Sequence, residues 1–303
     1  MRHYLHYDVF TRRRFEGNQL AVFTDSAALS DEQMQTITRE MNFSECTFLR
    51  PAEAPGTDIR VRIFTPDLEL PMAGHPTIGT AFALADSGVI RPGTPRVVFG
   101  LGVGPTPVEL TWEGQALSFA WMDQRPPEFR QPSSGEDAIL KAIGLDVSAR
   151  HPAGWPIQEV SCGVPYTLVP LATRDDVDRA EPDAAALGRL TSAFGKDFAA
   201  VYLFSVEPPG GDLTAYARMF VPGLGPVEDP ATGSAAGPLG CYLAAHTIVP
   251  SGDWDRMAMA QGVRMRRPSR IFVRVQGPAP DTIQRVQVGG QAVQVGQGTI
   301  DVE

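Results

Sequence analysis

The chain has 303 residues, which is enough for about two domains whose cores need neither disulfides nor a structural metal. Its formal net charge of -9, from 26 basic and 35 acidic residues, argues against binding along a nucleic-acid phosphate backbone. With 43% hydrophobic and 20% charged residues, the chain does not have the composition of a disordered protein. We therefore expect a folded protein without a nucleic-acid partner.

Sequence signatures of cofactor and metal sites are missing. No GxxxxGK[ST] stretch occurs, and the glycine run at 100–104 continues with Pro105 instead of completing a GxGxxG fingerprint. Lys141 and Lys196 are the only lysines, and neither lies in a sequence context that would desolvate an amine for Schiff-base chemistry. There is no HExxH or CxxC spacing. We expect neither a cofactor nor a metal.

The cysteines and the apolar segments indicate the cellular compartment of the protein. Cys46, Cys162 and Cys241 are odd in number and widely spaced, which is not a disulfide framework. The first residues contain no apolar signal segment, and no run of 18 uncharged apolar residues occurs. A cytoplasmic protein without a membrane partner is therefore expected.

The N-terminal region is expected to combine strands with one helix. Residues 3–10 and 20–24 are short strand candidates. Ser30 and Gln33 have the spacing of a capping box, and apolar residues then recur at helical spacing until Asn42, which ends the helix.

Extended segments follow. Residues 43–50 are extended, and 59–63 alternate apolar residues with arginine, as in a strand buried on one face. The apolar residues of 108–112 are expected to face those of 117–121 across a hairpin turn at 113–114.

A different pattern begins after Met72. Gly74, His75 and Pro76 precede a stretch that has no charged residue up to Ala85, and Gly88 follows it, which is the punctuation of a helix. A helix that is apolar on every face must be buried on every side. In a chain with many short strands, we expect such a helix inside a curled sheet.

The second half repeats this arrangement. The segment 229–234 opens another small, uncharged stretch that continues to His246, and 123–136 is a linker candidate between the halves. We predict an α+β fold of two pseudo-symmetric, barrel-like domains, each curled around a central buried helix. The first comprises 1–122, with a C-terminal strand at about 285–303 returning to it, and the second comprises 123–284.

Both helices start with a polar turn that contains glycine. Main-chain N–H groups at a helix N-terminus bind anions, and the helix dipole assists them. Tight packing explains the small residues inside the helices but not these turns. We therefore expect a small carboxylate as the ligand.

Several motifs, in order along the chain, closely resemble the PhzF phenazine-biosynthesis family. The main ones are Asn42–Phe48, Ala73–Thr77 and Glu228–Ala236. Supporting matches are Phe15–Asn18, Arg218–Gly223, Gln261–Gly262 and Arg267–Ser269. These matches extend over nearly the whole chain, and together they are specific.

The resemblance implies a diaminopimelate-epimerase-like fold with the active site between the two barrels. It also implies cofactor-independent isomerisation by general acid/base catalysis, as in trans-2,3-dihydro-3-hydroxyanthranilate isomerase, and a homodimer. The cysteine positions of the related epimerases correspond to Ala73 and Asp229 here, so racemisation by two thiols is not expected.

The resemblance assigns catalysis to Glu45, His75 and Asp229. On its own, Glu45 would be an exposed strand carboxylate, although Phe43, Thr47 and Leu49 on its side of the strand favour partial desolvation. His75 on its own could be a structural histidine, and Asp229 could simply complement a helix dipole.

Substrate contacts are expected from Asn18, Gly74, Gly233 and Ser234. The chain departs from the family pattern at Gln19, where proline is usual, at Cys46, where threonine is usual, and at Arg266, which replaces a glycine. Cys46 should point away from Glu45 into the core, and position 266 is one where glycine could serve unusual backbone angles.

The leading hypothesis is therefore an isomerase that moves a proton on a small cyclic or allylic carboxylate. An epimerase or dehydratase of an amino or hydroxy acid remains an alternative, as does a non-catalytic small-molecule binding protein on the same fold.

Overall fold

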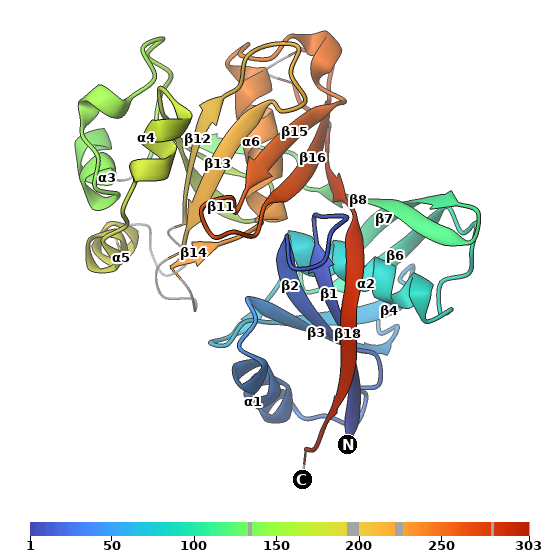
Figure 1. Ribbon diagram of the computed structural model, residues 1–303. Helices are drawn as coiled ribbons and strands as arrows, with labels where there is room; N and C mark the ends of the chain where they lie inside the picture. The colour runs from blue at the N-terminus through green and yellow to red at the C-terminus, as the bar shows by residue number, and fades with distance from the viewer. Residues whose placement is uncertain (133–134, 193–199, 222–226, 280–281, 303) are drawn as a thin grey trace. The chain divides into compact units, whose positions relative to one another are not determined.

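The computed structural model describes residues 1–132, 135–192, 200–221, 227–279 and 282–302 (Figure 1). The chain forms two compact units: unit 1 consists of Met1–Gln124 and Gln287–Glu303, and unit 2 of Arg125–Val286. Lys196 and the last two residues of the Arg218–Gly223 motif lie outside the described residues. Of the described helices, none is long and apolar enough to cross a membrane.

Unit 1 is a curled sheet around a helix. Its strands are β1 (Arg2–Val9), β2 (Asn18–Phe23), β3 (Glu45–Pro51), β4 (Ile59–Phe64), β5 (Glu69–Leu70), β6 (Arg96–Leu101), β7 (Gly104–Glu113), β8 (Ala116–Gln124) and β18 (Ala292–Ile300). They pair in the order β18–β1–β2–β3–β4–β6–β7–β8. Strands from both ends of this order contact α2 (Gly74–Asp86), so the sheet wraps around that helix (Figure 1).

The apolar helix predicted after Met72 is confirmed. Every residue of α2 from Gly74 to Leu84 is buried, and Gly88 beyond its end has φ +75°. The helix also approaches the sheet closely, because a Cβ on Gly79 would lie 2.5 Å from Leu20 and 2.7 Å from Val9. Small residues are therefore a packing requirement on this face.

The capped helix before β3 is also confirmed. It is α1 (Asp31–Met41), its capping box between Ser30 and Gln33 is complete, and Asn42 ends it in the left-handed conformation with φ 51°. Met34 and Ile37 of α1 belong to a buried cluster that includes Cys46 and Phe48 of β3. The inward direction expected for Cys46 is confirmed, and burial raises the pKa of its thiol to about 12.

Two details of unit 1 differ from the sequence-based expectation. Arg62 does not lie on an exposed face of β4: its side chain is 10% exposed and pairs with Glu69 at 2.6 Å and Asp31 at 2.5 Å. In the β7–β8 hairpin, a bulge between Thr111 and Trp112 shifts the register, so that Leu110 lies opposite Ala120. The alternation of apolar and polar residues along a strand predicts neither a buried, ion-paired arginine nor a β-bulge.

Unit 2 is built in the same way around α6 (Gly233–Ala245). Its strands are β9 (Glu128–Arg130), β10 (Gln158–Ser161), β11 (Pro165–Pro170), β12 (Val201–Val206), β13 (Ala215–Phe220), β14 (Glu228–Asp229), β15 (Met257–Gln261) and β16 (Ser269–Gln276), and β17 (Arg285–Gly290) spans the boundary with unit 1. Its other helices are α3 (Glu136–Ala142), α4 (Arg174–Arg179) and α5 (Ala184–Ser192), with 3-10 turns at Val147–Ala149 and Ser251–Asp253. The segment 123–136, expected to be a linker, contains β9, which pairs with β10.

The pairing patterns show that the two units repeat one architecture. In unit 1, β1, β2, β3, β4, β6 and β7 pair in turn as antiparallel, parallel, antiparallel, parallel and antiparallel neighbours. In unit 2, β10, β11, β12, β13, β15 and β16 pair in the identical sequence. The helices α2 and α6, each of 13 residues, follow the short strands β5 and β14. The internal repeat predicted from the sequence is confirmed.

Candidate active site

In unit 1, three of the candidate residues come together at the start of α2. Glu45 is the first residue of β3, and His75 is the second residue of α2. Glu45 Oε2 lies 3.3 Å from His75 Nε2, and the two side chains are 14% and 3% exposed. Asn18 approaches the opposite side of the imidazole, with its Nδ2 3.1 Å from His75 Nδ1. Gly74, the remaining candidate of this unit, is buried beside His75 as the first residue of α2.

The electrostatics of this group depend on burial. Desolvation lowers the pKa of His75 to about 3, and a main-chain contact with Gln19 offsets only part of that effect. The imidazole is therefore neutral at physiological pH. Its contact with Glu45 joins a carboxyl group to a neutral ring, so it is not an ion pair of opposite charges.

Strand register explains why these residues meet. Asn18 opens β2 and pairs with Val9, while Leu20 lies beside Glu45 in the parallel β2–β3 register. The hydroxyl of Ser44 donates to Asn18 Oδ1 at 3.1 Å, which leaves the amide nitrogen of Asn18 directed at His75. The site of unit 1 is thus assembled from the first residues of two neighbouring strands and the first turn of one helix.

The surroundings of Glu45 differ from the expectation in one respect. Thr47 is buried, and its hydroxyl lies 3.0 Å from that of Thr80 in α2, so this side of β3 faces the central helix. Phe43 does not share this side. It packs with the cluster under α1, and its ring centroid lies 4.7 Å from that of His6. Because β3 begins only at Glu45, strand alternation does not extend back to position 43.

In unit 2, the other candidates lie at the start of α6. Asp229 ends β14, Thr232 is the N-cap of the helix, and Gly233 and Ser234 are its first two residues. The Thr232 hydroxyl donates to Asp229 Oδ2 at 2.5 Å. The Ser234 hydroxyl is buried and lies 2.5 Å from the hydroxyl of Tyr166. This end of α6 therefore joins main-chain N–H groups with hydroxyls, a combination that suits a carboxylate ligand.

Four residues of this region were not assigned to the site from the sequence: Tyr166, Tyr202, Thr232 and Gln261. Thr232 and Gln261 could have been found from the sequence, because they lie within the Glu228–Ala236 and Gln261–Gly262 motifs. Gly262 carries a requirement of its own, because it has φ +74° and a Cβ there would lie 2.3 Å from the carbonyl oxygen of Arg267. No comparable pattern in the sequence indicates the two tyrosines, which strand pairing brings to this place.

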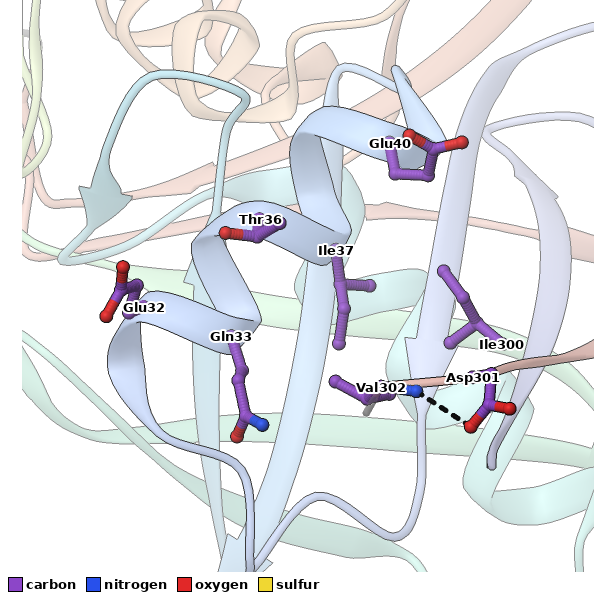
Figure 2. A pocket seen from close by; sticks show the side chains of 8 residues that line it. All are labelled: Glu32, Gln33, Thr36, Ile37, Glu40, Ile300, Asp301 and Val302. Atoms are coloured by element: carbon purple, nitrogen blue, oxygen red, sulfur yellow. Dashed lines mark hydrogen bonds between the residues drawn. The ribbon is translucent and has the colours of Figure 1, made fainter.

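A groove in unit 1 lies apart from these residues. It has a volume of about 510 Å³ and runs between α1 and the end of the chain (Figure 2). It is lined by Glu32, Gln33, Thr36, Ile37, Glu40, Ile300, Asp301 and Val302. None of the candidate residues lines it. Within the described part of the chain, no group of three or more His, Cys, Asp or Glu side chains could hold a metal ion.

Comparison with known proteins identifies the class of protein. A protein described as a probable proline racemase, from Agrobacterium radiobacter, has the same fold, with a TM-score of 0.70 over 100% of this chain and 94% of that one at 13% identity. The crystal structure of a PhzF-family phenazine biosynthesis protein from Bacillus anthracis gives a TM-score of 0.85 at 26% identity, covering 99% of both chains. The fold is therefore the epimerase-like one of two barrels around central helices.

The sequence comparisons give the family. The model of the phenazine biosynthesis-like proteins, PhzC-PhzF, matches residues 7–298. Trans-2,3-dihydro-3-hydroxyanthranilate isomerase of Pseudomonas chlororaphis is 38% identical over 99% of both chains. The chain belongs to the PhzF family and is an isomerase of that type, which confirms the family resemblance seen in the motifs.

Proposed function

We propose that the protein isomerises a small cyclic or allylic carboxylate by moving a proton, with Glu45 as the acid/base and no cofactor. The observation that carries this proposal is the buried contact between Glu45 and the neutral imidazole of His75. A carboxyl group that is largely removed from water and lies against a neutral ring suits proton exchange with carbon. The name of the 38% identical relative supports trans-2,3-dihydro-3-hydroxyanthranilate, or a close analogue, as the substrate.

The proposed reaction has two proton transfers. Glu45 removes a proton from an activated carbon of the substrate, and the electron pair left behind shifts along the adjacent double bond. The protonated Glu45 then returns the proton to the carbon at the far end of that system. One carboxyl group can serve both carbons if the substrate is held still between the two transfers.

Substrate binding is assigned to the residues around the two helix starts. In this proposal the first turn of α6, with Gly233 and Ser234, holds the substrate carboxylate through main-chain N–H groups and the Ser234 hydroxyl. His75 and Asp229 position the polar groups of the substrate, and Asn18 and Gly74 complete the contacts near His75.

The first test is the variant Glu45→Gln, which keeps the size of the side chain and removes its ability to accept a proton. We expect kcat to fall by roughly 10²–10⁴-fold, while calorimetry shows substrate binding within a few-fold of wild type. Glu45→Asp is the matched control, since it keeps the carboxyl group and should retain part of the activity. A Glu45→Gln enzyme with nearly normal turnover would eliminate Glu45 as the base.

A further inference from the structure

The loop that carries Asp229 into α6 is held by one buried side chain of β15. Gln261 is fully buried, and its side-chain amide takes part in four hydrogen bonds. Its Oε1 accepts from the Tyr202 hydroxyl at 3.1 Å and from the Thr232 main-chain N–H at 3.1 Å. Its Nε2 donates to the Asp229 carbonyl at 2.8 Å and to Thr232 Oγ1 at 3.0 Å. Both ends of the amide are therefore fully used.

The orientation of this amide follows from its main-chain partners. A main-chain N–H can only donate, so the atom of Gln261 that faces the Thr232 N–H is the oxygen. A main-chain carbonyl can only accept, so the atom that faces Asp229 is the nitrogen. Tyr202 agrees with this assignment, because burial and the nearby Asp229 charge raise the pKa of its hydroxyl and keep it a donor.

The orientation of the Gln261 amide in turn fixes the direction of the hydrogen bonds made by the Thr232 hydroxyl. Its Oγ1 receives a hydrogen from Gln261, so the single hydroxyl proton is directed at Asp229 Oδ2, 2.5 Å away. This hydroxyl makes no capping bond to α6, although Thr232 is the N-cap residue. The hydroxyl thus accepts from Gln261 and donates to the Asp229 carboxylate instead of capping the helix. With Oδ2 accepting from Thr232, a proton taken up by Asp229 is directed to Oδ1.

We propose that Gln261 and Thr232 are positioning residues, which orient the Asp229 carboxylate toward the substrate and fix the oxygen that can carry a proton. This inference rests on the proposed function, in which Asp229 contacts the substrate. It concerns hydrogen bonds within unit 2 alone, and it assigns a role to two residues that do not themselves need to touch the substrate.

The test compares Thr232→Val with Thr232→Ser in the full-length enzyme, with trans-2,3-dihydro-3-hydroxyanthranilate as the probe. Valine keeps the branched shape but removes the hydroxyl, whereas serine keeps the hydroxyl. We expect Thr232→Val to lower kcat by roughly 10–100-fold with KM changed less than about threefold, and Thr232→Ser to stay within about threefold of wild type. In a double-mutant cycle, adding Thr232→Val to Asp229→Asn should lower kcat by less than about twofold.

A readout without substrate tests the hydrogen-bond chain itself. The Gln261 side-chain NH₂ protons should exchange slowly with solvent in wild type and in Thr232→Ser, and at least tenfold faster in Thr232→Val, as measured by NMR. Equal exchange rates in the three proteins would contradict the series of hydrogen bonds from Gln261 through Thr232 to Asp229. This result would count even if the wild type does not turn over the probe.

The outcomes separate this inference from the proposed function. A wild-type enzyme inactive on the probe counts against the proposed substrate, and the NH₂ exchange then decides the inference. If Asp229→Asn impairs turnover while Thr232→Val does not, only the positioning role is overturned. Equal losses in Thr232→Val and Thr232→Ser also overturn it, because the hydroxyl is then not the cause. Normal turnover in Asp229→Asn contradicts both the role of Asp229 and the inference.

Discussion

The imidazole of His75 occupies a position where a positive charge is costly. It is almost completely buried at the N-terminal end of α2, where the helix dipole also disfavours a cation. The same burial keeps the ring neutral in the native state, and a neutral ring has one N–H donor and one acceptor nitrogen. Nδ1 is hydrogen-bonded to Asn18 Nδ2, and Nε2 lies 3.3 Å from Glu45 Oε2.

This burial predicts a pH dependence of stability. The pKa of His75 is about 3 in the folded protein and about 6.5 when unfolded. Between these values the unfolded chain binds a proton that the native state does not, so acidification favours unfolding. We expect this residue to lower the free energy of unfolding by about 1.4 kcal/mol for each pH unit below roughly 6.5.

Urea unfolding at pH 7 and pH 5 measures this effect. His75→Gln is the matched variant, because glutamine is polar and does not titrate. The loss of stability between the two pH values should be smaller in the variant by about 2 kcal/mol. The same loss in both proteins would show that His75 is not held neutral by the fold.

At the scale of elements, sequence patterns predicted the helices whose formation depends on residues within the helix itself. The capping box of α1 and the uncharged stretch of α2 each depend on residues within one element, and both are confirmed. The burial of Arg62 and the bulge at Thr111 depend on partners elsewhere in the chain. Strand alternation cannot reveal such partners, and it also placed Phe43 on the wrong side because β3 starts later than expected.

In the candidate site too, some features could be predicted from the sequence and others depend on tertiary contacts. Family motifs brought Glu45, His75 and Asp229 to attention, and the structure shows Glu45 beside His75. The direction of the bonds around Gln261 could not be read from the sequence, because it depends on the main-chain N–H of Thr232 and the carbonyl of Asp229. A tertiary hydrogen-bond network of this kind leaves no periodic signal.

The turn between β15 and β16 contains a testable strain. Arg266 has φ 58°, in the left-handed region, and the motif resemblance to the PhzF family implies glycine at this position. An L-residue with a Cβ is disfavoured there, so Arg266→Gly should stabilise the protein by about 1 kcal/mol. Thermal unfolding followed by circular dichroism measures the change.

Arg264 provides the control for this prediction. It lies in the same turn and is exposed, but its φ is not positive. Arg264→Gly should therefore lower the stability slightly, since glycine only adds freedom to the unfolded chain. Equal effects of the two substitutions would show that backbone strain at Arg266 is not the cause.

At the scale of the whole molecule, a repeated architecture supplies two different sets of polar residues. Unit 1 places Glu45, His75 and Asn18 at the start of α2, and unit 2 places Asp229 and Ser234 at the start of α6. Both helices have 13 residues, and nearly all residues of each are buried. The repeat therefore gives each unit a helix start at the same place, and the different residues at that start and on the neighbouring strands give each unit its own chemistry.

The central claim is that Glu45 moves a proton between two carbons of the substrate. The most direct measurement is the reaction of trans-2,3-dihydro-3-hydroxyanthranilate in deuterated water, followed by NMR for the position of the proton in the product. We expect rearranged product in the wild type, with deuterium at the protonated carbon to the extent that the Glu45 proton exchanges with solvent. With Glu45→Gln, both product formation and exchange should slow by roughly the 10²–10⁴-fold expected for its kcat. Rearrangement by Glu45→Gln at the wild-type rate would contradict the account.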